Sequence, residues 1–182
     1  MFFSEFKLIN YDFIVMLLTD DEQRQDYLSR HVKVSKKISN EEFRYMIYFF
    51  DLTKIVPTYV IICKDFSPFI FFFVNRNDYK EATRHLNKLR KDLHKKLLII
   101  QTERTLKDLI YSLFPDLTIK EFNLIMCNKD LIHIELFFQT FEERGIAIGR
   151  NGDYIKTINL ILNEFISISC FTNTIKLECK VA

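Results

Sequence analysis

The glycines are the residues that most clearly mark a candidate binding site in this sequence, because the chain has only three and all lie within eight positions. They are Gly145, Gly149 and Gly152. Glycine tolerates positive φ and lets a backbone approach a ligand closely. Residues 149–152, which we call the glycine turn, place Arg150 and Asn151 between two glycines and predict a tight turn between two helices. Unpaired N–H groups at the start of the second helix, together with the Arg150 cation, would attract a phosphate.

The spacing of the glycines argues against two common nucleotide-binding motifs. No G-x-x-x-x-G-K-[ST] string occurs, and the observed G-x-x-x-G-x-x-G does not match the dinucleotide fingerprint G-x-G-x-x-G. The motif that remains is a GXXG loop, which in KH domains clamps a short run of nucleic-acid backbone. The alternative is a helix–turn–helix corner whose glycines serve packing alone.

The longer string around the turn, Ile-Ala-Ile-Gly-Arg-Asn-Gly at 146–152 followed by Ile155 and Lys156, closely resembles the second KH domain of the NusA family of transcription factors. Ser-Asn-Glu-Glu-Phe-Arg-Tyr at 39–45 resembles the opening helix of that family. The resemblance extends over residues 38–179 and is to the archaeal type, two KH domains in tandem. It implies RNA contacts at Gly145, Ile146, Ile148, Gly149, Arg150, Asn151, Gly152 and Lys156.

For the whole chain, the resemblance implies an α+β fold of two tandem KH-like domains. Each would be a mixed three-stranded sheet packed with helices. It also implies binding of single-stranded RNA and action with RNA polymerase in elongation or termination. A ribosome-associated KH protein is the runner-up, with the ribosome as partner. A KH-fold scaffold that no longer binds RNA is the third possibility.

Hydrophobic periodicity and capping signals predict the elements that must hold the turn. Ser39 and Glu42 form a capping box before a helix that ends ahead of Pro57. Apolar runs at 58–63 and 69–74 predict strands, the second buried on both faces. The other predicted strands are 96–100, 119–126, 131–138, 166–170 as the closing strand, and 175–179. The other predicted helices are 77–94 as a pair, 102–113 capped by Thr102, 142–148 and 153–165.

The predicted order β-β-α-α-β occurs twice, so we expect three parts: an N-terminal extension at 1–37, a KH-like domain at 38–116 and a KH domain at 117–182. The resemblance places the first GXXG on residues 80–83, where Lys-Glu-Ala-Thr has no glycine. The first domain is therefore either a scaffold or binds differently. The extension has an apolar run at 13–18, too short to span a bilayer, and no signal-peptide pattern. We expect it to be an extra packing element rather than a partner-binding arm.

Cations are concentrated in residues 76–96, which carry +5 although the whole chain carries only +2. Five of them recur at steps of four, four, three and four, and would form one stripe on an unbroken helix. We call this set the basic stripe: Lys80, Arg84, Lys88, Lys91 and Lys95. It is either a solvated face or a secondary RNA contact that captures backbone charge.

Composition sets the remaining expectations. The four cysteines lack C-x-x-C spacing, which favours free thiols in a reducing compartment over disulfides or a zinc site. The scarcity of glycine and alanine beside abundant Phe, Ile, Lys and Asn indicates an AT-rich genome, hence the cytoplasm or an organelle stroma or matrix. The histidines show no ligand spacing and no nucleophile–base pair is visible. We expect that the protein is not an enzyme, uses no cofactor, binds no metal and does not associate with a membrane.

Overall fold

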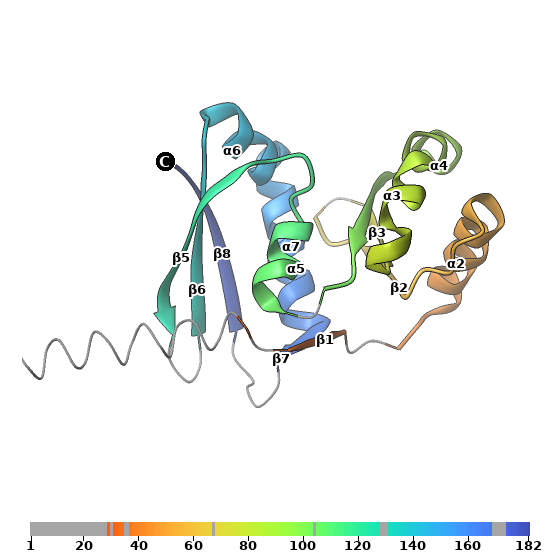
Figure 1. Ribbon diagram of the computed structural model, residues 1–182, viewed down its shortest axis with the longest axis horizontal. Coiled ribbons are helices and arrows are strands. Elements are labelled where there is room, and N and C mark those ends of the chain that lie inside the picture. The colour runs from red at the N-terminus through yellow and green to blue at the C-terminus, as the bar shows by residue number, and fades with distance from the viewer. Residues whose placement is uncertain are drawn as a thin grey trace, which may run out of the picture.

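The fold is α+β, with helices packed on three small sheets (Figure 1). The computed structural model describes residues 29, 31–34, 37–66, 68–103, 105–127, 131–168 and 174–182. The apolar run predicted at 13–18 and most of the N-terminal extension lie outside these residues. Among the described residues, no helix has the length and apolar character needed to cross a bilayer.

The first unit begins with helix α2 and is built on the sheet order β2-β3-β4. Strands β2 and β3 pair antiparallel, whereas β3 and β4 pair parallel. Its elements are α2 (Asn40–Thr53), β2 (Tyr59–Cys63), β3 (Phe69–Val74), α3 (Arg76–Arg84), α4 (Leu86–Leu93) and β4 (Lys96–Gln101). Helix α5 (Leu106–Ser112) then leads to the second unit.

The second unit repeats this topology with the sheet order β5-β6-β8, again an antiparallel pair followed by a parallel one. Its elements are β5 (Ile119–Cys127), β6 (Leu131–Phe138), α6 (Phe141–Ile148), the 3-10 turn η1 (Arg150–Gly152), α7 (Asp153–Glu164), β7 (Ile166–Ile168) and β8 (Thr174–Val181). The predicted closing strand at 166–170 is wrong, because β8 closes this sheet and β7 does not belong to it.

Strand β7 instead pairs antiparallel with β1 (Val32–Val34), far away in sequence. A second link nearby is the isolated bridge between His31 and Thr105. Val32 and Val34 are half-buried and pack on the larger core. The described part of the N-terminal extension is therefore a packing element, and it joins the second unit.

Strand β3 is the central strand of the first sheet and is buried on both faces, which confirms the prediction from its continuous apolar run. One face of its sheet, including Phe72, packs against α2, α3 and α4 in a core with Phe49 and Leu89. The other face contributes Phe69, Phe71 and Phe73 to a larger core. That core continues through α5 and α7 to the second sheet, so the two units share it.

Local capping explains where two of the helices begin. Ser39 Oγ accepts from the Glu42 N–H and Glu42 accepts from the Ser39 N–H, which confirms the predicted capping box. The predicted cap at Thr102 is wrong: α5 begins after Thr105, whose hydroxyl accepts from the Asp108 N–H at 3.2 Å. Thr102 Oγ1 is buried without a hydrogen-bond partner.

Candidate nucleic-acid interface

The glycine turn joins α6 to α7, as predicted, and its backbone conformation depends on both glycines. Gly149 has φ 76° and ψ 172°, a combination almost confined to glycine. Gly152 and Asn151 are both left-handed, with φ 75° and φ 55°. A Cβ on Gly149 would lie 2.7 Å from the Tyr154 Cβ, whereas one on Gly152 would meet only the Lys156 side chain at ordinary distance.

Two N–H groups of this turn are available to a ligand. The N–H of Gly149 is bonded to Gly145 O and that of Gly152 to Gly149 O. The N–H groups of Arg150 and Asn151 have no backbone acceptor outside the turn among the described residues, and both residues are exposed. Successive free N–H groups in such a turn form a concave site for an anion, and the N-terminus of α7 adds a positive potential.

Tyr154 fixes the turn to the rest of the molecule. Its ring packs edge-on against Phe114, with centroids 5.8 Å apart, and lies 5.5 Å from the ring of Phe69. Its hydroxyl donates to Leu113 O at the end of α5. Burial raises the pKa of Tyr154 well above the ordinary 10.0, so the phenol stays protonated and keeps donating. The turn is therefore positioned by contacts with both α5 and β3.

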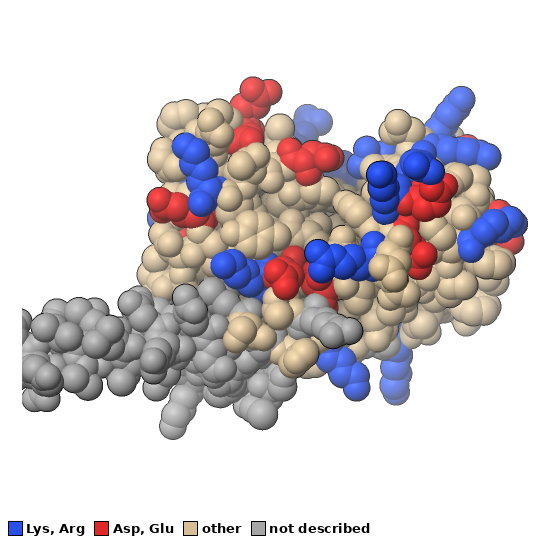
Figure 2. Space-filling model, viewed as in Figure 1, with Lys and Arg blue, Asp and Glu red and all other residues tan. Residues whose placement is uncertain are grey.

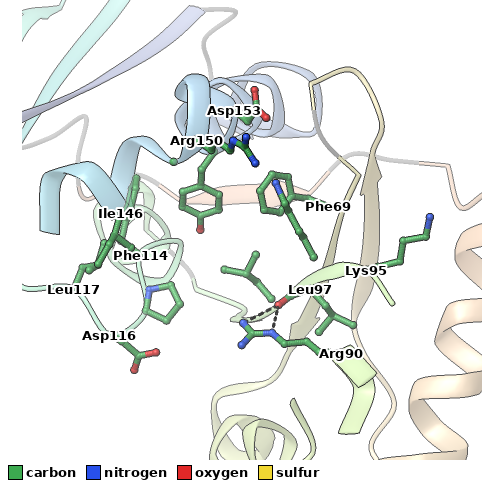
Figure 3. Close-up of a pocket in the computed structure, with 15 residues that line it drawn as sticks. Phe69, Arg90, Lys95, Leu97, Phe114, Asp116, Leu117, Ile146, Arg150 and Asp153 are labelled. Carbon is green, nitrogen blue, oxygen red and sulfur yellow. Dashed lines mark hydrogen bonds between the residues drawn. The ribbon is translucent and has the colours of Figure 1, made fainter. Parts of the chain in front are cut away.

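A cleft of about 510 Å³ lies beside the glycine turn, between the two units (Figure 3). The turn and α6 form one wall with Gly149, Arg150 and Ile146. The segment after α5, residues 114–117, forms the second wall, and β3 and β4 form the third. Apolar side chains line its inside, among them Phe69, Leu97, Leu98, Phe114 and Leu117. Ile146, 57% exposed, stands at its edge.

Charged groups around the cleft are predominantly basic. The lining includes four cations, Arg90, Lys95, Lys96 and Arg150, against the carboxylates of Asp116 and Asp153. The Arg90 guanidinium turns inward and donates to Leu97 O at 3.0 and 3.1 Å. Lys96 lies over the Phe69 ring, 5.0 Å from its centroid. An apolar cleft with a basic rim suits an unstacked base whose phosphates stay at the edge.

The basic stripe is not continuous, contrary to the unbroken helix that it required. α3 ends at Arg84 and α4 begins at Leu86, with His85 between them. All five cations of the stripe are exposed, and Lys and Arg gather over α3 and α4 in Figure 2. Only Lys95 reaches the cleft. Arg84 forms an ion pair with Glu81 on its own helix.

The position inferred for the first GXXG was also wrong. Residues 80–83 lie inside α3, and the turn that corresponds to the glycine turn is at His85. The His85 N–H is already bonded to Ala82 O and Thr83 O. This turn has neither a glycine nor a positive φ, so it cannot present its backbone to a phosphate as residues 149–152 do.

The other predicted site residues have different environments. Ile148 is half-buried and packs on the larger core, so it supports the turn rather than facing solvent. Gly145 is exposed on α6, and a Cβ added there would have no neighbour within 4 Å. Lys156 is exposed, but its Nζ donates to Asn151 O at 3.1 Å and lies 5.8 Å from the Phe66 ring centroid.

A second polar cluster lies on the outer face of the second sheet, where ligand atoms of His133, Glu135 and Glu178 come within 4.8 Å of one another. Sequence spacing did not predict it, because His133 and Glu178 belong to neighbouring strands. Lys180 pairs with Glu135 at 2.7 Å and Lys176 with Glu178 at 2.6 Å. The hydrogen bond from Lys176 lowers the pKa of Glu178. Both carboxylates are already neutralised by lysines, so we assign the cluster to the ion pairs of this face.

Cys63 and Cys179 lie outside any disulfide, as expected, and both are buried. Burial raises the pKa of the Cys179 thiol to about 12, so it stays protonated. Neither thiol lines the cleft.

Sequence reasoning missed the residues that the first unit contributes to the cleft, chiefly Phe69, Arg90 and Lys96. It also missed Tyr154, whose partners Leu113 and Phe114 come from α5 and the residues just after it. One signal was present: Tyr154 follows the glycine turn closely, and a buried tyrosine needs a partner for its hydroxyl.

Comparison with known proteins gives a fold and no family. No protein-family model matches the chain, and no curated protein does. In overall structure the chain is similar to a solved structure described as "Crystal structure of APE1850", with a TM-score of 0.55 and 21% sequence identity. The match covers 78% of this chain and 100% of that chain. At this identity the likeness shows that the two chains share an α+β fold, and it carries no information on activity.

Proposed function

We propose that this chain is a single-stranded RNA-binding protein, built from two KH domains in tandem, of which only the second has a working GXXG loop. The observation that carries the proposal is the exposed pair Arg150 and Asn151, whose N–H groups have no backbone acceptor outside the glycine turn among the described residues, next to the Arg150 side chain. Phosphates of a single strand would lie on this turn. A neighbouring base would enter the apolar cleft, which a stacked duplex could not do.

The proposal extends to a NusA-like role with RNA polymerase, in elongation or termination. This part is supported by the resemblance of residues 146–152 and 39–45 to the NusA family, and by the β-β-α-α-β topology of both units. Affinity for RNA alone is modest, since one loop holds about four nucleotides. A polymerase surface would then raise the local concentration of the emerging transcript.

The direct test replaces Arg150 and Asn151 with Asp, with both glycines kept. Fluorescence anisotropy with a single-stranded ten-nucleotide RNA should show at least a tenfold loss of affinity, because two carboxylates now repel the phosphate. The matched control is Lys120→Asp with Asn123→Asp, the same change on exposed positions of β5. Equal affinities of wild type and the turn variant, with unchanged thermal unfolding, would refute the proposal.

Partner and strand preference need separate measurements. Duplex RNA of the same sequence should displace the labelled single strand from the protein poorly. A tagged chain should retain RNA polymerase subunits from nuclease-treated lysate. Recovery of ribosomal subunits instead would support the ribosome-associated alternative, and recovery of neither, with no RNA affinity, would support a scaffold.

A further inference from the structure

One side of helix α2 carries a row of apolar side chains that face solvent. Half of the large hydrophobic residues that are exposed in the described chain lie in or beside this helix, and they are 41% to 63% exposed. We call them the α2 row: Ile38, Phe43, Ile47, Phe50 and Val56. The other side of α2 is buried on the first sheet through Glu42, Phe49 and Thr53. Contiguous exposed apolar patches usually mark an interaction site.

α2 lies at the outer edge of the first unit, far from the glycine turn (Figure 1). Phe43, Ile47 and Phe50 follow helical spacing and share one face, along about half of a helix about 21 Å long. None of the three lines the cleft beside the glycine turn. The row is therefore a surface separate from the proposed RNA site.

The α2 row is nearly symmetric about its own middle. Ile47 is the centre, Phe43 lies four residues before it and Phe50 three residues after it. Ile38 and Val56 lie nine residues away on either side. Such a pattern suits an interface between identical copies, because in a two-fold contact residue i meets j and j meets i.

Charges beside the row follow the same symmetry. Arg44 and Asp51 are two helical turns apart on one edge of the row, and both are exposed. In an antiparallel pair of helices, matching edges face each other, so each Arg44 would face Asp51 of the second copy. In a parallel pair this edge would instead face the opposite edge of the second helix, and the Arg44–Asp51 contacts would not form.

We propose that α2 forms the interface of a homodimer, in which two copies of the helix pack antiparallel across a two-fold axis at Ile47. Phe43 of one copy packs on Phe50 of the other, and Ile47 meets its own counterpart. The contact is one helix against one helix, at the small end of specific interfaces, so dimerisation depends on concentration. The proposal does not rest on RNA binding.

The first test is sedimentation equilibrium of the full chain, over concentrations from about 1 µM to 1 mM. Wild type should pass from monomer to dimer within this range. Ile47→Glu should remain monomeric, since it would bring two carboxylates together at the axis, while Ile47→Leu should dimerise like wild type. Because Ile47 is 47% exposed, both variants should fold, and circular dichroism checks this.

Charge reversal tests the antiparallel geometry itself. Arg44→Glu and Asp51→Arg should each weaken the dimer at least tenfold, because each creates two like-charged contacts. The double variant Arg44→Glu with Asp51→Arg should recover wild-type affinity. A wild type that stays monomeric at 1 mM, or a double variant as weak as the single ones, would overturn the proposal. Either result would indicate that the partner of this face is a different protein.

Discussion

The two units share one topology but differ at the turn between their paired helices. In the second unit α6 ends at Gly149 with φ 76°, and within the described part of the chain the N–H groups of Arg150 and Asn151 have no backbone acceptor outside the turn. In the first unit α3 ends at His85 with φ −91°, and its N–H is bonded within the helix. The same fold therefore carries one turn that can bind an anion through its backbone and one that can do so only through side chains.

The first unit has no glycine turn, but it places cations beside the cleft. Its cations Arg90, Lys95 and Lys96 line the same cleft as Arg150. If the second unit holds phosphates on its turn, the first supplies the opposite wall and the apolar floor. Phosphate contacts from lysines carry no base identity, so this wall would add affinity without sequence preference.

The largest effect is expected at the glycine that distinguishes the two turns. Gly149→Ala should lower the free energy of unfolding by about 2 to 5 kcal/mol, from positive-φ strain and a Cβ that collides with Tyr154. Urea unfolding measures this. The matched control is Gly145→Ala, which has open space in a helix and should stabilise by about 0.5 to 1 kcal/mol. Equal effects of the two changes would mean that the turn is not built around Gly149.

The next effect concerns the anchor of the second turn. Tyr154→Phe should cost about 1 to 2 kcal/mol, since the buried Leu113 O loses its donor. It should also change the alkaline limb of the stability curve. The raised pKa of Tyr154 means that its contribution is complete below pH 10 and is lost as pH rises above that.

Unfolding titrations at pH 8 and pH 11 should therefore show a smaller difference for Tyr154→Phe than for wild type. Tyr111→Phe is a suitable control, since Tyr111 is exposed. An identical alkaline decline in wild type and Tyr154→Phe would contradict the buried, protonated phenol.

A smaller effect separates the two groups of cations in the first unit. The double variant Lys95→Ser with Lys96→Ser should weaken binding of a ten-nucleotide RNA about tenfold. The slope of log affinity against log salt should become shallower by about 1.4, at roughly 0.7 per phosphate contacted on a single strand. Lys88→Ser with Lys91→Ser removes the same charge from positions outside the cleft and should change the slope much less. Equal losses would mean that the whole basic stripe touches RNA.

The smallest effect is expected at Lys156. Its ammonium group is already bonded to Asn151 O and lies near Phe66, so it is turned toward the protein. Lys156→Gln should leave the salt slope of RNA binding unchanged, whereas Arg150→Gln should reduce it by about 0.7. A reduced slope for Lys156→Gln would show that the Lys156 ammonium exchanges its hydrogen bond to Asn151 O for a contact with a phosphate.

Local signals in the sequence were sufficient for the glycine turn, for the capping box at Ser39 and for a β3 strand buried on both faces. Each depends on a few neighbouring residues. The partner of β7 was not predictable in this way, because alternation at 166–168 suits any half-buried strand and does not specify which strand it pairs with. The first turn was misplaced since no glycine marks it. The cleft was missed because its walls come from segments far apart in sequence.

The pairing of β1 with β7 has a consequence for synthesis on the ribosome. Ser167 donates to Lys33 O, a carbonyl 134 residues earlier in the chain. At about 5 to 20 residues per second, β1 would wait roughly 7 to 27 s for its partner to be made. During that time Val32 and Val34 lack both their strand partner and part of the core on which they pack. Strand β1 therefore cannot take its final place until residues 166–168 have been made.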